Sequence, residues 1–325
     1  MGIITEDMIK QFQKMLDDID GSLKMTFENM HQGYPGENLC RFLKARDGNI
    51  SKAQKMLLDC LDWRIQNEID DILAKPIIPA DLYRAVRDSQ LVGMSGYTKE
   101  GLPVVAVGVG LSTYDKASIH YYIQSHIQMN EYRDRVILPT ATKKYGRHIN
   151  TCVKILDMTG LKLSALNQIK ILTAISTIDD LNYPEKTDTY YIVVRPLLQE
   201  RTRKKIQVLQ GCGRDELLKI MDYASLPHFC RREGSGSSRH SRTEKDDNCF
   251  SLDNTYHQQL YDFVKRQAEL KDRVAPVKQG SFHVDFPEPA PDDAKIAETI
   301  QSEFQRLGDQ SKLSKSLSNL DINGH

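Results

Sequence analysis

The side chains with the clearest capacity for chemistry lie in one basic run, Arg201-Thr202-Arg203-Lys204-Lys205. On a helix, residues four apart share a face, so Arg201 and Lys205 would lie together with the Thr202 hydroxyl beside them. Two cations and a hydroxyl near the start of a helix suit a phosphate group. The alternative is a helix face that contacts only water, and composition alone favours that alternative.

A glycine pair offers a second candidate site. Gly108 and Gly110 follow an expected strand, as in a dinucleotide-binding turn, but Thr113 stands where that turn has its third glycine. We therefore expect a turn that ends the strand, and we discount a nucleotide-dependent oxidoreductase. The sequence indicates no cofactor.

Acidic and histidine residues give weaker signals. Asp179 and Asp180 are adjacent, and adjacent helix residues point about 100° apart, so they do not converge as an acid–base pair. We expect them to form a solvated helix end. His120 and His126 do not have the i,i+4 spacing that shared metal ligation on a helix needs, so no metal site is predicted.

The composition limits the classes of partner. Lys plus Arg and Asp plus Glu both number 44, so no net field draws the molecule to nucleic acid, and any membrane attraction must come from a local patch. Six cysteines without a C-x-x-C pair argue against a disulfide framework and indicate reduced thiols. The longest apolar run, 102–111, is shorter than the ~20 residues of a membrane span, so we expect a soluble, cytoplasmic protein.

Periodicity predicts helices first and an α/β domain second. Ser51 to Gln54 form a capping box in front of a run with apolar residues at helical spacing. β-Branched runs predict strands at 103–107, 152–156 and 190–193, with helical stripes between them. Alternation of strands and helices indicates a mostly parallel sheet.

These patterns divide the chain into three parts. Residues 1–88 form an N-terminal helical region, and residues 89–270 form the α/β domain. A glycine- and serine-rich stretch at 234–248 predicts a flexible loop inside that domain. Prolines and charges dominate residues 271–325, which predicts a disordered tail.

Four motifs occur in combination between about residues 36 and 252. They are Leu39-Cys40-Arg41-Phe42-Leu43-Lys44-Ala45-Arg46, Ile155-Leu156-Asp157-Met158-Thr159-Gly160-Leu161, Asn182-Tyr183-Pro184-Glu185, and Arg195-Pro196-Leu197-Leu198 with Thr202 and Lys205. This combination resembles the CRAL-TRIO domain of the plant-type, Sec-fourteen-like phosphatidylinositol/phosphatidylcholine transfer proteins. The resemblance implies N-terminal helices followed by a lipid-binding domain, in which a mostly parallel sheet floors an apolar cavity that a mobile helix closes. It implies a binding protein and not an enzyme.

The resemblance also implies which residues contact a lipid headgroup. Thr202 and Lys205 match the threonine and lysine that contact the headgroup phosphate. Glu185 matches the acidic residue that contacts the inositol hydroxyls, with Lys186 beside it. Arg46 matches the first member of a basic pair and completes the expected set.

The chain departs from the family pattern at two places near this set. Asp47 puts a negative charge where the second basic residue is expected, which should weaken the attraction of a phosphate. Cys152 and Lys154 stand where dual-specificity relatives have the hydroxyl side chains that hold a choline headgroup. We therefore expect phosphatidylinositol binding without phosphatidylcholine binding.

A third departure is the junction Val193-Val194. Relatives continue this strand through an Asn-Ala-Pro turn and an aromatic-rich helix before the residues that match Arg195-Pro196. Roughly a dozen residues are absent, enough for a strand end and two to three helical turns. The sequence thus predicts a chain that lacks part of its gating helix, through alternative splicing, a mis-predicted gene model or adaptive loss.

Two functions remain open on these grounds. The first is phosphatidylinositol binding with transfer or presentation at membrane surfaces, where the protein would associate peripherally and transiently. The second is a lipid-sensing regulatory or scaffold protein with impaired transfer. Either function could involve another phospholipid, a lipid kinase or a signalling partner; neither involves nucleic acid.

Overall fold

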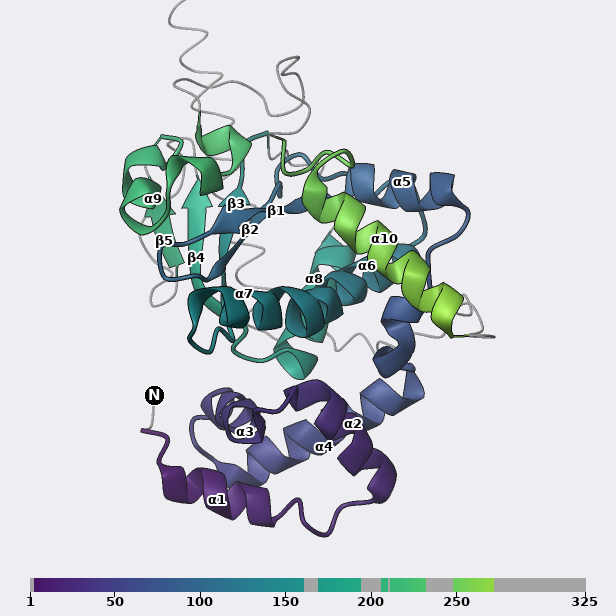
Figure 1. Ribbon diagram of the computed structural model, residues 1–325, viewed down its shortest axis with the longest axis vertical. Helices are drawn as coiled ribbons and strands as arrows, with labels where there is room; N and C mark the ends of the chain where they lie inside the picture. The colour runs from purple at the N-terminus through teal and green to yellow at the C-terminus, as the bar shows by residue number, and fades with distance from the viewer. Residues whose placement is uncertain (1–2, 161–168, 194–205, 210, 232–247, 272–325) are drawn as a thin grey trace, which may run out of the picture.

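The computed structural model describes residues 3–160, 169–193, 206–209, 211–231 and 248–271. In these ranges a helical N-terminal unit lies against one end of an α/β unit, which confirms the predicted fold class (Figure 1). The first six helical elements are α1 (Glu6–Lys14), α2 (Gly21–His31), α3 (Pro35–Lys44), α4 (Ile50–Gln66), η1 (Ile69–Ala74) and α5 (Ala80–Ser89). Apolar side chains of α1 to α4 form a core of their own around Phe12, Phe42 and Leu57.

Helix α4 begins slightly earlier than the sequence suggested. The Asn49 side chain accepts a hydrogen bond from the Lys52 backbone N–H at 2.9 Å, so Asn49 is the N-cap. Ser51 lies inside the first turn, and the predicted capping box is wrong. Asparagine is as good a cap as serine, so the sequence offered two neighbouring solutions and local energetics alone did not separate them.

The sheet has five strands in the order β1-β2-β3-β4-β5. They are β1 (Val92–Tyr97), β2 (Pro103–Val107), β3 (Cys152–Asp157), β4 (Thr187–Val193) and β5 (Ile206–Leu209). Strands β2 to β5 are parallel, and β1 pairs antiparallel with β2. The three strands expected from the sequence are β2, β3 and β4; β1 and β5 were not predicted.

One continuous helical stretch leads from β2 to β3. It consists of α6 (Ile119–Tyr132), a π-helical turn at Arg133–Ile137 and α7 (Leu138–Tyr145). Pro139 lies in the first turn of α7, and a proline inside a regular helix has no N–H to donate and clashes with the carbonyl four residues earlier. The wide turn in front of Pro139 accommodates both defects.

The other described helices are α8 (Ile169–Asn182), α9 (Arg214–Ile220), η4 (Tyr223–Ser225), η5 (His228–Cys230) and α10 (Thr255–Leu270). Of these, α8 lies between β3 and β4 in the sequence, and the rest follow β5. No helix among the described residues is both long and apolar enough to cross a membrane.

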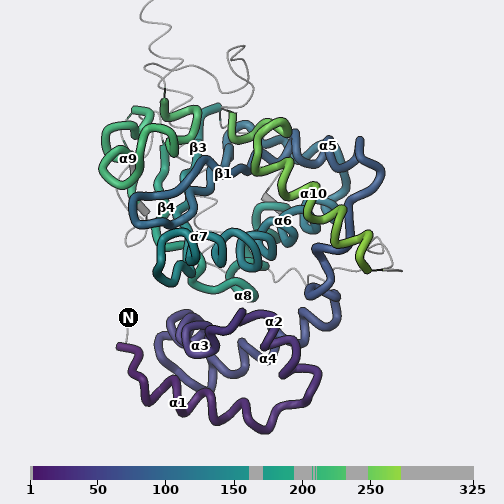
Figure 2. The backbone as a smooth tube through the Cα atoms, viewed as in Figure 1, coloured from purple at the N-terminus to yellow at the C-terminus, as the bar shows by residue number. Residues whose placement is uncertain are grey.

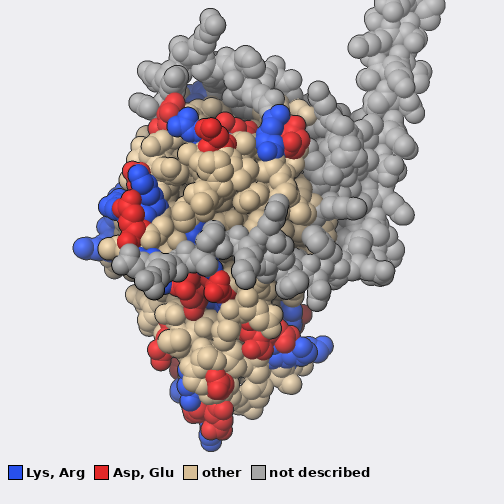
Figure 3. All heavy atoms as spheres, turned by 90° about the vertical axis from the view of Figure 1, so that its right-hand side faces the viewer, with Lys and Arg blue, Asp and Glu red and all other residues tan. Residues whose placement is uncertain are grey.

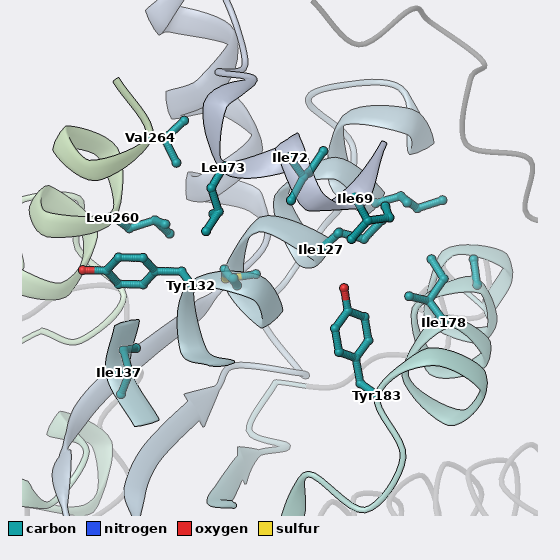
Figure 4. Packing of buried hydrophobic residues seen from close by; sticks show 13 residues of the cluster. Ile69, Ile72, Leu73, Ile127, Tyr132, Ile137, Ile178, Tyr183, Leu260 and Val264 are labelled. Atoms are coloured by element: carbon teal, nitrogen blue, oxygen red, sulfur yellow. The ribbon is translucent and has the colours of Figure 1, made fainter. Parts of the chain in front are cut away.

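Helix α10 returns the chain to the junction of the two units. In Figures 1 and 2 its yellow-green ribbon crosses close to η1, and Lys271 just after it forms an ion pair with Asp71. Figure 4 shows Leu260 and Val264 of α10 in one core with Ile72 and Leu73 of η1. The last described helix therefore packs on a segment close to the N-terminal helices.

Candidate headgroup site

Three of the five residues expected to contact a headgroup line one open pocket. Arg46 follows α3, Glu185 and Lys186 connect α8 to β4, and all three border a cavity of about 470 Å³. The pocket therefore combines the N-terminal helical unit with the α/β unit. Thr202 and Lys205 lie outside the described residues, and β5 begins directly after Lys205.

Charged side chains of both signs surround the pocket, with a surplus of cations. The four cations that line it are Arg46, Arg133, Lys154 and Lys186. The three carboxylates that line it are Asp179, Asp180 and Glu185. Cations suit a phosphate and carboxylates accept hydrogen bonds from hydroxyls, so the lining fits a ligand that carries both groups.

Lys186 is held on one wall by an ion pair. Its Nζ lies 3.0 Å from Asp134 Oδ2, and only 11% of its side chain is exposed. Burial lowers the pKa of Lys186 to about 8; Asp134 opposes this shift, while the positive charges of Arg41 and Arg133 add to it. Asp134 also accepts from Arg133 Nε at 2.7 Å, so one carboxylate serves two cations. A further anion at this wall would find cationic charge that is incompletely neutralised.

Asp179 also lines the pocket, and the expectation of a solvated helix end was wrong for it. Asp179 Oδ1 contacts His126 Nε2 and Asn130 Nδ2, each at 2.7 Å, and its Oδ2 lies 3.3 Å from Lys154 Nζ. Burial alone would raise the pKa of Asp179, but His126 and Lys154 hold it well below its usual range. The partners come from α6 and β3, far away in sequence, so the aspartate pair itself gave no sign of them.

The two departures from the family pattern occupy different places. Lys154 lines the pocket, where its Nζ also lies 5.7 Å from the centre of the Tyr190 ring. Asp47 is exposed and borders a neighbouring cavity of about 590 Å³, which shares Glu185 with the first. Asp47 therefore does not line the pocket in which Arg46 takes part, and the weakening of phosphate attraction expected from it would have to act from outside that pocket.

The other candidates from the sequence have structural roles in the described part of the chain. The Gly108 N–H donates to the Leu91 carbonyl at 2.8 Å, and residues 108–111 leave the sheet as a turn, as predicted. His126 Nε2 contacts Asp179 Oδ1, as described above. Among the described residues, no group of three or more His, Cys, Asp and Glu side chains is arranged to hold a metal ion.

Sequence reasoning missed Arg133, Asp134 and Tyr183 as parts of this site. A signal existed, because the charged run Glu131-Tyr132-Arg133-Asp134-Arg135 interrupts an otherwise apolar helical stripe. Buried charges require partners, so such a run in an apolar stripe indicates a polar network. Charged side chains also occur at the surface: on the molecular face drawn in Figure 3, acidic and basic side chains lie next to one another.

Comparison with family models gives two adjacent matches. Residues 8–59 match the CRAL/TRIO N-terminal domain, and residues 87–230 match the CRAL/TRIO domain. Arg46 falls in the first match, while Glu185 and Lys186 fall in the second, so the pocket draws on both.

Curated relatives and a solved structure agree with these matches. The chain is 27% identical over 253 residues to the phosphatidylinositol/phosphatidylcholine transfer protein SFH9 of Arabidopsis thaliana, covering 70% of this chain and 42% of that protein. It is 26% identical to SFH11 of the same plant, covering 69% of this chain and 62% of that protein. This chain therefore spans less than two thirds of the length of these relatives. The crystal structure of Sfh5 shares the fold, with a TM-score of 0.52 and 18% identity over 82% of this chain and 99% of that one. The sequence motifs, the two family matches and the fold together show that the chain belongs to the CRAL-TRIO family and is homologous to the plant Sec-fourteen-like transfer proteins.

Proposed function

We propose that this chain binds phosphatidylinositol with its headgroup in the pocket of Arg46, Glu185 and Lys186. The observation that carries the proposal is the convergence of these three residues from two structural units on one cavity. Glu185 accepts hydrogen bonds from inositol hydroxyls, and the cations attract the phosphate. Thr202 and Lys205 complete the phosphate contacts.

The proposed activity is binding followed by transfer or presentation at a membrane surface, without bond-making chemistry. Acyl chains would be held through burial of apolar area, at about 25 cal/mol per Å². The protein would act in the cytoplasm, associate peripherally with membranes, and present lipid to a kinase or signalling partner. The names of its plant relatives, which refer to phosphatidylinositol and phosphatidylcholine, support this class of ligand.

We further propose that phosphatidylcholine is not a ligand. The Lys154 ammonium lies in the pocket, and its side chain is only 16% exposed. A trimethylammonium group placed near it would meet a like charge at short range, where solvent screens weakly.

Lipid composition of the purified protein tests the proposal directly. Native mass spectrometry of the full chain should show a bound phosphatidylinositol. A protein that carries no lipid and takes none from vesicles would contradict the proposal. That result would favour the alternative role as a lipid-sensing scaffold, which is supported by the shortened connection after Val193.

Replacement of Lys205 by alanine is expected to weaken phosphatidylinositol binding by about 1.5–3 kcal/mol, because a charged hydrogen bond to the phosphate is lost. A titration with labelled lipid measures the effect, and circular dichroism verifies the fold. Lys204→Ala removes the same charge one position earlier and serves as the control. Equal affinities of the two variants would contradict the specific role of Lys205.

Binding is also expected to depend on pH through Lys186. Its pKa of about 8 means that the ammonium is charged at pH 7 and mostly neutral at pH 9, so affinity for the anionic lipid should fall over this interval. The Lys186→Arg variant keeps its charge throughout and should show a flatter profile. Identical profiles for the two proteins, measured with phosphatidylinositol vesicles, would show that Lys186 does not contribute.

A further inference from the structure

The loop that carries Glu185 is held in a conformation that its sequence does not favour. Glu185 has a φ of 57°, in the left-handed region that suits glycine and is unfavourable for other residues. Such a conformation persists only where neighbouring contacts determine it. The contacts on both sides of Glu185 therefore decide where its carboxylate lies.

The residue after Glu185 is fixed by the sheet. The Lys186 carbonyl accepts the backbone N–H of Cys152 at 3.0 Å, and Lys186 Nζ pairs with Asp134. These contacts lie within the α/β unit and anchor only one end of the loop.

The residue two positions before Glu185 is held by a carboxylate of α6, which the N-terminal unit in turn holds through Arg64. The Tyr183 hydroxyl donates to Glu131 Oε1 at 2.7 Å. Arg64 of α4 binds both oxygens of the same carboxylate, at 2.8 Å from Nη1 to Oε1 and 3.0 Å from Nη2 to Oε2. Figure 4 shows the Tyr183 side chain directed from the loop towards Ile69 and Ile127.

More contacts from α4 reinforce this end of the loop. The Cys60 thiol lies 3.7 Å from the Asn182 carbonyl, in hydrogen-bonding geometry, and burial raises the pKa of that thiol to about 12, so it remains protonated. The Trp63 ring lies edge-on to Tyr183, with 6.4 Å between ring centres. One helix of the N-terminal unit thus contacts both the last residue of α8 and the first residue of the loop.

The pair at the centre of this arrangement is suited to positioning. Arg64 and Glu131 side chains are only 2% and 3% exposed. A bidentate pair of guanidinium and carboxylate fixes orientation as well as distance. Tyr183 therefore meets an acceptor that cannot reorient without breaking two other hydrogen bonds.

We propose that Arg64 and Glu131 are positioning residues which, through the Tyr183 hydroxyl, hold Glu185 where it reads inositol. The N-terminal helical unit then determines headgroup selectivity as well as supplying Arg46. The role of Glu185 in inositol recognition rests on the proposed phosphatidylinositol function. The positioning of the loop by Arg64, Glu131 and Tyr183 does not depend on that function.

The Tyr183→Phe variant tests the structural part without any lipid. It removes one hydroxyl and retains the ring, so the fold should survive. Hydrogen exchange of the apo protein should become at least about fivefold faster for amides in 182–186, since roughly a 1 kcal/mol hydrogen bond is lost. Tyr132→Phe, a change to another buried tyrosine of the core, should leave exchange in that segment unchanged. Unchanged exchange in Tyr183→Phe would overturn the inference.

Headgroup selectivity tests the functional part. Vesicles containing phosphatidylinositol or phosphatidylglycerol present the same charge and differ in hydroxyl pattern. Tyr183→Phe should reduce the preference for phosphatidylinositol by roughly five- to tenfold with little change toward phosphatidylglycerol, because Glu185 is misplaced while the cations remain. Arg64→Lys, which keeps the charge but loses the bidentate contact, should reduce the preference in the same direction.

The outcomes separate the two proposals. If the wild-type chain binds phosphatidylinositol selectively and Tyr183→Phe is equally selective, the positioning role is wrong and the proposed function stands. If the wild-type chain shows no preference, the inositol-reading role of Glu185 is wrong, whatever the exchange data show about the loop.

Discussion

A chain with glutamine in place of Glu131 is expected to lose about 3–5 kcal/mol of unfolding free energy, the cost of breaking a buried ion pair by removing one partner. The amide could no longer act as a bidentate acceptor for Arg64, whose side chain is only 2% exposed. Arg135, whose Nη2 lies 2.6 Å from Glu131 Oε2, would lose its closest carboxylate. Asp70 contacts both arginines, but its single carboxylate would then face two cationic side chains.

Urea unfolding monitored by circular dichroism measures this loss. The exposed pair of Lys55 and Asp59 on α4 gives the control, because its side chains are 77% and 62% exposed. Asp59→Asn should cost less than about 1 kcal/mol, as exposed pairs do. A cost for Glu131→Gln no larger than this control would show that the buried network contributes little to stability.

The same carboxylate gives the stability a defined pH dependence. Burial alone would raise the pKa of Glu131, but Arg64 and Arg135 lower it to about 2. A carboxylate with a lowered pKa in the folded state stabilises the fold above its unfolded pKa of about 4.5 and loses that contribution as pH falls towards 2. The glutamine variant lacks this component, so the difference between the two proteins should shrink in acid.

Lengthening the connection after Val193 is expected to raise lipid transfer by about tenfold or more, equivalent to lowering the barrier by at least 1.4 kcal/mol. Strands β4 and β5 are parallel neighbours, and the chain has twelve residues, 194–205, to return from the end of one to the start of the other. A crossover between parallel strands takes a dozen or more residues. The present length is therefore close to the minimum and leaves little chain for a gate.

The insertion consists of an Asn-Ala-Pro turn and an aromatic-rich helix of roughly two to three turns between Val193 and Val194. Vesicle-to-vesicle transfer of labelled phosphatidylinositol is measured for both forms. A glycine- and serine-rich insert of equal length separates the effect of length from that of the helix. Equal transfer by the unmodified chain and the lengthened chain would show that the missing residues are not a gate.

The parts of the fold that were predictable depend on local pattern. Strands β2, β3 and β4 are runs of β-branched and aromatic residues, and α6 and α8 show helical periodicity, so short windows sufficed. The motif with Glu185 was also recognisable, and Glu185 lines the same cavity as Arg46. Val193, the last residue of β4, pairs with both Asp157 and Leu209, so the strand stays paired on both sides up to the short connection.

What the sequence concealed depends on contacts between distant residues. Strand β1 contains Gly93, where a Cβ atom would lie 1.7 Å from the Cys249 carbonyl oxygen, so glycine is required by a segment more than 150 residues away. Weak β propensity at such a position hid the strand. Strand β5 has only four residues, Ile206–Leu209, and follows directly on the basic run, so its short apolar pattern was not recognised. The predicted gate, the phosphate contacts at Thr202 and Lys205, the loop at 234–248 and the tail fall wholly or largely outside the described residues.

The π-helical turn in front of Pro139, Arg133–Ile137, contacts three separate stretches of chain. Within it Arg133 contacts Asn130 of its own helix, Asp134 reaches Lys186 of the pocket, and Arg135 donates to the Asp70 carbonyl of η1. Loss of one residue there would restore a regular helix and rotate everything that follows by about 100°. A single-codon deletion in this turn would thus remove one residue and yet disconnect the two units from the pocket they share.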